Sequence, residues 1–318
     1  MVINLSPHLV GGWFFEILLA LSLGVGLVIN QASLSGIYKS FLTIFNEQLT
    51  VTQPTWPRIA MEVPSTGSEI DYKWLLSIPM LREWIGERYI KNMEAMSWII
   101  KNKTFEGTVG VLRELIEDDQ VGVYRPIIQG LADNTMLHPD LLSFTLLKGG
   151  FDTLCFDGQF FFDTDHPVAG ASVSNHGGGA STPWYLLCTK KPFKPLIKQN
   201  RRPPAFLAKD KLDDDNVFMK NEFLYGVDYR GNAGYGLWQL AFGSKQTLNA
   251  ANYAAARAAM LSFKNEEGIP LNVVPDLLVV PPTLEGAGNA LLKAQKDAAG
   301  ADNIWVGTAE LMVSPWLA

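Results

Sequence analysis

The pattern of apolar and polar positions from Ser97 onward predicts a half-buried strand. Side chains alternate in character from Trp98, and Val109 and Val111 continue the alternation on one face. A period of two sends successive side chains to opposite faces of a strand. The acidic pair Asp118 and Asp119 then marks the start of a segment with a different period.

After this pair, apolar residues recur at helical spacing as far as Gly149 and Gly150, which predicts one long helix. The expected buried stripe consists of Tyr124, Ile127, Ile128, Leu131, Leu141, Leu142, Thr145 and Leu146. Pro139 lies inside the pattern. Because proline lacks an amide hydrogen and its ring clashes with the carbonyl of Thr135, we expect a kink or a break there. At about 1.5 Å per residue the helix would span roughly 40 Å and act as a structural spine.

Two segments before this region combine aromatic residues with polar ones. Residues 30–55 carry a helical stripe that includes Phe41 and Phe45, and such a stripe packs either in a core or on another chain. Residues 58–96 begin with turn chemistry around Gly67 and continue with mixed aromatic and arginine residues, which is typical of an interface and also of a small local core. The candidate contacts between subunits are Tyr72, Trp74, Trp84, Arg82, Arg88, Phe41 and Phe45.

The rest of the chain predicts a loop-rich stretch and then sheet and helix. Residues 151–183 are rich in turn-forming residues, and residues 184–245 predict antiparallel strands separated by Gly and Pro. A helix over 247–264, capped by Thr247 or Asn249, precedes a buried strand over 276–282, a second helix over 283–298 and a last strand over 308–318. Strands that alternate with helices in this way indicate a small α/β lobe.

Several stretches, taken in order, are similar to the major head subunit of Mu-like phages and prophages. They are IKNKTFEGTVGV, IEDD, LLKGGF, FDGQFFFDTDHPV and LLVVPP, and the resemblance runs from about Val28 to the C-terminus. It implies a capsid shell subunit with an α+β fold of the Hong-Kong-97 type. The implied parts are an N-terminal arm (30–57), an extended loop that reaches over a neighbour (58–96), a peripheral domain with the spine helix (97–183) and its antiparallel strands (184–245), and a small axial α/β domain (246–318).

Residues 1–29 form an apolar N-terminal extension in which Glu16 is the one charged side chain between Gly11 and Ile29. The length approaches that of a membrane span. However, no Lys or Arg occurs in the first 38 residues, so the basic flank of a signal peptide or membrane anchor is missing. We expect an extension ahead of the family's usual start, or an arm that packs on a neighbour, rather than a membrane anchor.

The composition indicates a folded protein that does not bind nucleic acid strongly. Of the 318 residues 47% are hydrophobic and 18% are charged, with a formal net charge of −6 and a pI of about 5.3. An acidic chain suits the wall of a DNA container better than a clamp on DNA, which would normally be basic. Cys155 and Cys188 lack metal or redox spacing, and we expect two reduced, buried thiols.

Three stretches carry candidate chemistry. Asp163, Asp165 and His166 could hold a metal or set a base beside carboxylates, although a turn stabilised by Asx hydrogen bonds explains them as well. GNAGYG at 231–236 has the dinucleotide fingerprint in reverse order and leads into a strand, so it does not predict a nucleotide loop. Asp213–Asp215 reads as a solvated loop or a cation site between subunits. We expect no catalytic, cofactor or metal residues.

The sequence therefore predicts a structural protein that assembles into an icosahedral shell around double-stranded DNA. Its expected partners are further copies of itself in pentamers and hexamers, with portal, scaffold or protease, and decoration proteins, and no membrane. It would be assembled in the host bacterial cytoplasm and reside in the virion capsid. The alternatives are an encapsulin-like compartment and a metal-dependent hydrolase that uses Asp163, Asp165 and His166.

Overall fold

Residues 28–76, 97–118, 121–296 and 300–318 are described by the computed structural model, and the chain divides into two units, each with its own hydrophobic core. The first unit comprises Met1–Thr52, Phe105–Thr135 and Pro204–Asp228; the second comprises Gln53–Thr104, Met136–Pro203 and Tyr229–Ala318. Four elements contribute residues to both units: α4 (Arg125–Gly149), β4 (Lys103–Leu112), β9 (Leu196–Lys209) and β10 (Glu222–Tyr235). The predicted extension at residues 1–29 lies almost wholly outside the described residues.

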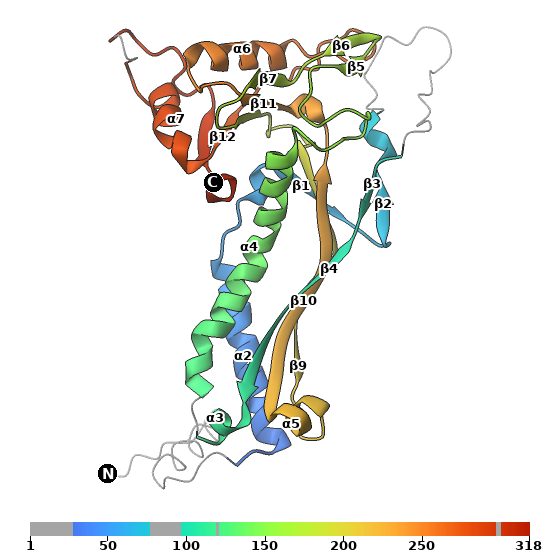
Figure 1. The fold of residues 1–318 in the computed structure, drawn as a ribbon, viewed down its shortest axis with the longest axis vertical. Coiled ribbons are helices and arrows are strands. Elements are labelled where there is room, and N and C mark those ends of the chain that lie inside the picture. The colour runs from blue at the N-terminus through green and yellow to red at the C-terminus, as the bar shows by residue number, and fades with distance from the viewer. Residues whose placement is uncertain (1–27, 77–96, 119–120, 297–299) are drawn as a thin grey trace, which may run out of the picture. The chain divides into compact units, whose positions relative to one another are not determined.

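Helix α2 (Gln31–Val51) supplies one wall of the first core. Its first turn is fixed by a reciprocal cap, in which the Ser33 N–H donates to Asn30 Oδ1 (2.9 Å) and the Asn30 N–H donates to Ser33 Oγ (3.0 Å). Apolar residues recur every three or four positions along the helix, so one face is buried. In Figure 1 this helix lies beside the first half of α4, and both contribute residues to the first core.

Phe41 and Phe45 lie in this core and are each about 1% exposed. The Phe41 ring meets Tyr225 edge-on at 5.0 Å, and the Phe45 ring packs on Phe206 at 5.0 Å. The helical stripe predicted for residues 30–55 is therefore confirmed. Its interpretation as a set of contacts with another subunit is wrong for these two residues, because the chain covers both rings itself.

The long helix predicted before Gly149 is confirmed as α4, and it continues through Pro139 without a break. Its buried face differs from the predicted stripe at Ile127 in the first half, which is 47% exposed, and more widely in the second half. Leu141 is 42% exposed, whereas Asp140, Ser143 and Phe144 are buried. The apolar pattern was a poor guide here because two of the buried residues are polar.

Hydrogen bonds to its carboxylate explain why Asp140 is buried. Its carboxylate accepts hydrogen bonds from the backbone N–H groups of Thr55 (2.9 Å) and Trp56 (2.6 Å), and from the Thr55 hydroxyl (2.8 Å). A buried carboxylate is tolerable when donors replace its lost water. The interaction fixes the chain as it enters η1 (Trp56–Arg58).

The second unit contains a five-stranded mixed sheet with the order β13-β12-β8-β11-β7. Its strands are β7 (His176–Gly179), β8 (Trp184–Leu187), β11 (Ala241–Lys245), β12 (Leu277–Val280) and β13 (Glu310–Val313). Strand β8 is antiparallel to β11 and to β12, whereas β12–β13 and β11–β7 are parallel. The predicted border between 245 and 246 is therefore wrong, because β8 and β11 share one sheet with β12.

A four-stranded sheet with the order β1-β9-β10-β4 holds the long strands. The first strand, β1 (Ala60–Pro64), pairs in parallel with β9, so not all pairings of the 184–245 region are antiparallel as predicted. Next to it along the chain, β2 (Glu69–Asp71) pairs antiparallel with β3 (Ile99–Lys101). The start of the predicted extended loop is thus built into the second unit, and residues 77–96 lie outside the described residues.

The remaining elements are shorter. They are α3 (Arg113–Glu117), α5 (Asp215–Lys220), α6 (Ala250–Leu261), α7 (Glu285–Leu292), β5 (His166–Val168), β6 (Ala171–Val173), η2 (Lys73–Leu76), η3 (Val121–Tyr124), η4 (Trp238–Leu240), η5 (Pro282–Leu284) and η6 (Pro315–Leu317). The predicted helix over 247–264 is confirmed as α6, with Asn249 as its cap: Asn249 Oδ1 accepts from the Asn252 N–H at 2.9 Å. Among the described helices, none combines the length and apolar character needed to cross a bilayer.

The Phe162 ring is packed against two glycines. A Cβ at Gly150 would lie 2.7 Å from this ring, and a Cβ at Gly243, on β11, would lie 2.7 Å from it. Both distances are shorter than carbon atoms can approach without repulsion, and Phe162 is only 1% exposed. The ring therefore requires a residue without a side chain at each position.

We predict that Gly243→Ala lowers the free energy of unfolding of the isolated subunit by about 1–3 kcal/mol, because overpacking a closed core forces its neighbours apart. Gly286→Ala, on α7 where nothing lies within 4 Å, is the control. It should be neutral or stabilising by up to about 1 kcal/mol. Chemical denaturation of both variants measures the difference, and equal stabilities would contradict the packing argument.

Candidate functional site

His166 is the centre of a buried hydrogen-bonded cluster in the second unit. Its side chain is fully buried, with Nδ1 2.7 Å from Asp157 Oδ2 and Nε2 3.1 Å from Asn175 Oδ1. The Trp238 ring stacks on the imidazole with 3.9 Å between ring centroids and 11° between planes. Both ring nitrogens and one face are thus engaged, so the imidazole has no free nitrogen with which to act as a general base.

The side chains of Asp163 and Asp165 interact with each other, but among the described residues this predicted trio with His166 does not bring its ligand atoms close enough together to share an ion. Asp163 instead accepts from the backbone N–H groups of Phe160 (3.1 Å) and Thr164 (2.7 Å), which confirms the turn interpretation. The hydrolase alternative therefore lacks its site.

Asn175 connects this cluster to the surrounding backbone. Its Nδ2 donates to the carbonyl oxygen of Phe161 at 2.8 Å and also faces the carbonyls of Trp238 and Ala241 at 3.4 and 3.3 Å. Its Oδ1 accepts from the Asp163 N–H at 2.9 Å in addition to His166. These partners fix which end of the amide is the oxygen.

The same contacts shift the pKa values of Asp157 and Cys155. Burial alone would raise the pKa of Asp157, but hydrogen bonds from His166 and Cys155 hold the pKa below its ordinary value. Burial raises the pKa of the Cys155 thiol, and the adjacent Asp157 carboxylate raises it further. Cys155 and Cys188 are both free and buried, as predicted.

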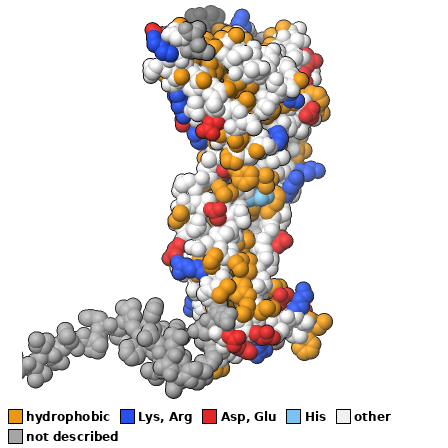
Figure 2. Space-filling view, turned by 60° about the vertical axis from the view of Figure 1, so that its left-hand side comes forward, with side chains coloured by type: hydrophobic (Ala, Val, Ile, Leu, Met, Phe, Trp, Pro, Cys, Tyr) orange, Lys and Arg blue, Asp and Glu red, His pale blue; other side chains and the backbone are white. Residues whose placement is uncertain are grey.

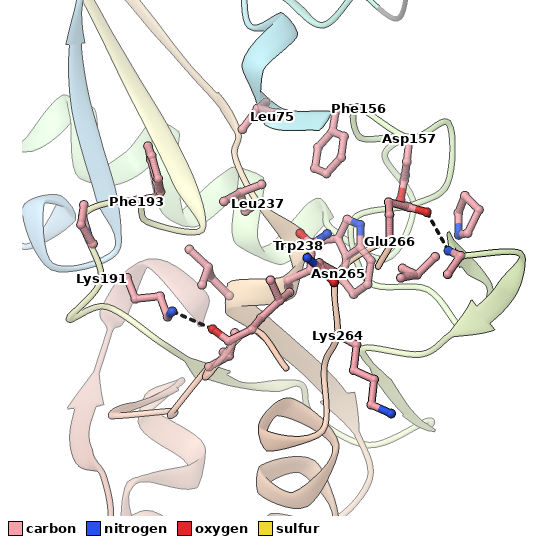
Figure 3. A pocket seen from close by; sticks show the side chains of 18 of the residues that line it. Leu75, Phe156, Asp157, Lys191, Phe193, Leu237, Trp238, Lys264, Asn265 and Glu266 are labelled. Atoms are coloured by element: carbon pink, nitrogen blue, oxygen red, sulfur yellow. Dashed lines mark hydrogen bonds between the residues drawn. The ribbon is translucent and has the colours of Figure 1, made fainter. Parts of the chain in front are cut away.

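A cavity of about 520 Å³ opens beside the cluster. Figure 3 shows its lining of mostly apolar side chains, which include Phe156, Phe193 and Leu237, together with Asp157 and Trp238 from the cluster. Lys191 is held at the wall by its Nζ, which donates to the Leu271 carbonyl oxygen at 2.8 Å.

Comparison with known proteins decides the family. The model of the Mu-like prophage major head subunit gpT matches residues 34–317. The chain belongs to this family. It is 39% identical over 306 residues to the major capsid protein of Escherichia phage Mu, covering 92% of this chain and all of that protein. It is 38% identical to the Mu-like prophage FluMu major head subunit of Haemophilus influenzae, covering 81% of this chain and 89% of that one.

Solved capsids agree with this assignment. The chain is similar to the subunit in the procapsid of bacteriophage JBD30, with a TM-score of 0.81 and 42% identity over 91% of this chain and 100% of that one. The subunit of the JBD30 capsid is similar to the chain with a TM-score of 0.74 and 34% sequence identity, over 92% of this chain and 100% of that one. The α+β fold of phage major capsid proteins, of the Hong-Kong-97 type, is thereby confirmed. The chain is a structural head subunit and not an enzyme.

The other candidate contacts of this head subunit have different outcomes. Tyr72 is buried, and its hydroxyl donates to Gln199 Oε1 at 2.9 Å. It therefore belongs to the subunit's own core, and its prediction as a contact between subunits is wrong. Burial raises the pKa of Tyr72 to about 12. Arg82, Trp84 and Arg88 lie outside the described residues, as does the side chain of Trp74, and for these four the prediction stays a prediction.

The sequence patterns did not predict three members of the buried cluster, nor the short helix α5. Cys155, Asp157 and Asn175 carry no recognised motif, and only the turn at Asp157-Gly158 hinted at a return of the chain toward His166. Strands alone were predicted over residues 184–245, but the structure has helix α5 from Asp215 to Lys220, and the next strand begins at Glu222.

We predict that Asn175→Ala lowers the free energy of unfolding of the head subunit by more than about 3 kcal/mol, because several buried donors and acceptors lose partners worth about 1–3 kcal/mol each. Asn232→Ala is the control, since its half-buried amide makes only two bonds: Nδ2 donates to the Lys101 carbonyl at 2.8 Å, and Oδ1 accepts from the adjacent Ala233 N–H at 2.9 Å. It should cost about 1 kcal/mol or less. Denaturation of the dissociated subunits compares the two, and a similar loss in both would contradict a special role for Asn175.

Proposed function

We propose that this head subunit assembles, as pentamers and hexamers, into an icosahedral shell that encloses double-stranded DNA. The observation that carries the proposal is the family match over residues 34–317. Chains similar to it occur in the procapsid and in the capsid of bacteriophage JBD30. The net charge of −6 supports a container that repels its contents over one that binds DNA by its backbone.

Further partners are part of the proposal. A capsid of bacteriophage JBD30 is decorated with minor capsid protein trimers, and its subunit resembles this chain with a TM-score of 0.72. This supports a decoration protein as a partner. Portal and scaffold or protease partners, and assembly in the host bacterial cytoplasm, follow from the same proposed role as the wall of a phage head.

Purified full-length subunit should form closed shells. Size-exclusion chromatography with negative-stain microscopy would show particles, with pentamers or hexamers as smaller species. A small monodisperse oligomer that never yields shells, under conditions in which a related phage subunit assembles, would contradict the proposal.

Contacts between subunits need exposed apolar side chains, and α5 in the first unit offers them. Phe218 is 87% exposed and Met219 is 75% exposed. Figure 2 shows that hydrophobic side chains reach the drawn face at several places among charged ones. Large apolar side chains in water commonly mark a contact surface.

The helix that carries these side chains is held firmly. Asn216 Nδ2 donates to the carbonyl oxygens of Lys209 (3.2 Å) and Glu222 (2.7 Å), which ties the helix to both flanking strands. Asn221 closes the helix in the left-handed conformation, with φ of 53°. A rigid mount lowers the entropy lost when an exposed ring docks. We therefore include α5, with Trp74, Trp84, Arg82 and Arg88, among the proposed contacts.

Phe218→Ala should leave the melting temperature of the dissociated subunit unchanged and reduce particle yield. Losing an anchor residue costs about 2 kcal/mol per contact, and a shell repeats the contact many times. Val217→Ala, one position earlier and 5% exposed, should instead lower the melting temperature, because it removes core packing. If Phe218→Ala gives a normal yield of shells, α5 is not a contact.

A further inference from the structure

Cys155, Asp157 and His166 present one sulfur, one oxygen and one nitrogen atom that all lie within 4.8 Å of one another. Within the described ranges, they are the one group of three such side chains close enough to share an ion. All three come from the second unit and are held by local structure, with His166 at the start of β5 and the other two on the preceding loop. The described turn therefore brings together three different ligand types.

The hydrogen positions in this cluster are set by its acceptors. Asn175 Oδ1 lies 3.1 Å from His166 Nε2, and the amide orientation is fixed, so Nε2 carries a hydrogen. Two more hydrogens lie between the ligand atoms themselves. One joins Nδ1 to Asp157 Oδ2 over 2.7 Å, and the other joins Cys155 Sγ to Asp157 Oδ1 over 3.1 Å.

A divalent cation can replace these two hydrogens without changing the net charge of the site. The two hydrogens that leave carry the same total charge as the doubly charged ion that enters. Burying net charge is what makes most interior ionic sites costly. The exchange avoids that cost, and the two displaced protons leave to solvent.

The surroundings match what metal-binding histidines need. A ligating imidazole usually donates its other N–H to an oxygen that fixes its orientation, and Asn175 Oδ1 already does this for Nε2. Trp238 fixes the ring plane from its face. Of the three ligands, Asp157 lines the 520 Å³ cavity, so the cluster borders open space on that side.

We propose that Cys155, Asp157 and His166 bind a divalent cation of the zinc class. A thiolate with an imidazole and one carboxylate suits Zn²⁺ or Co²⁺, whereas Mg²⁺ and Ca²⁺ require mostly oxygen ligands. The ion would join the loop at 155–157 to β5 and stabilise the second unit. This inference is independent of how the subunits pack in a shell.

The test uses Co²⁺ as a probe, because its complexes with thiolate absorb light and Zn²⁺ complexes do not. Full-length subunit is stripped with a chelator and titrated with Co²⁺. We expect one ion per chain, a sulfur-to-cobalt charge-transfer band in the near ultraviolet, and a higher melting temperature. Added Zn²⁺ should abolish the band by displacement.

Matched variants decide which cysteine is responsible. Cys188→Ser removes the other buried free thiol and should keep the band, whereas Cys155→Ser should lose the band and the thermal shift. Asp157→Asn, which keeps the side-chain shape, should also lose the thermal shift and serves if Cys155→Ser fails to fold. The proposal is overturned if the unmodified chain shows no charge-transfer band at millimolar Co²⁺, or if the band survives in Cys155→Ser.

Discussion

The second unit depends on one buried amide. Asn175 directs its side-chain Nδ2 at three carbonyl groups from two segments and orients His166 through Oδ1. Its own backbone N–H donates to Asp163 O (3.0 Å), and its carbonyl oxygen accepts from the Gly243 N–H (3.0 Å). A loop with little regular structure cannot bury its backbone unless such partners exist. The amide supplies them, and the loop from Phe151 to Asp165 can then cover the sheet with its phenylalanines instead of remaining in solvent.

Elements with strong local signals could be predicted from the sequence. Strand β4 alternates in burial along its length, and α6 has an alanine-rich body with an asparagine cap, so neither needs information from elsewhere in the chain. The predicted stripe was correct at Tyr124, just before α4, and at Ile128, and wrong at Ile127 and Leu141, which are exposed. An apolar pattern cannot reveal that Asp140 turns inward, because the donors that stabilise its carboxylate lie about 85 residues away at Thr55.

The candidate site shows the same limit. His166 was selected together with its neighbours in sequence, Asp163 and Asp165, although its actual partners lie nine residues away on either side. Those partners are set by the way the β5–β6 hairpin and the Asp157 turn fold back, which single-sequence patterns do not encode. The function could be predicted from the family resemblance. That Phe41, Phe45 and Tyr72 lie in the core and not at a contact between subunits could be learned only from the folded structure.

The strand order of the five-stranded sheet has a consequence for biosynthesis. Strand β8 ends at Leu187, but one of its two neighbours, β12, begins only at Leu277, and the sheet is complete only when β13 is made. Similarly, β1 can pair only after β9 has been made, because Ala60 pairs with Leu196, about 136 residues later in the chain. Such distant pairings carry a large loop-closure entropy and slow folding. On the ribosome, β8, which is fully buried in the folded subunit, must therefore keep one edge unpaired until most of the chain has been synthesised, and an unpaired apolar edge favours aggregation.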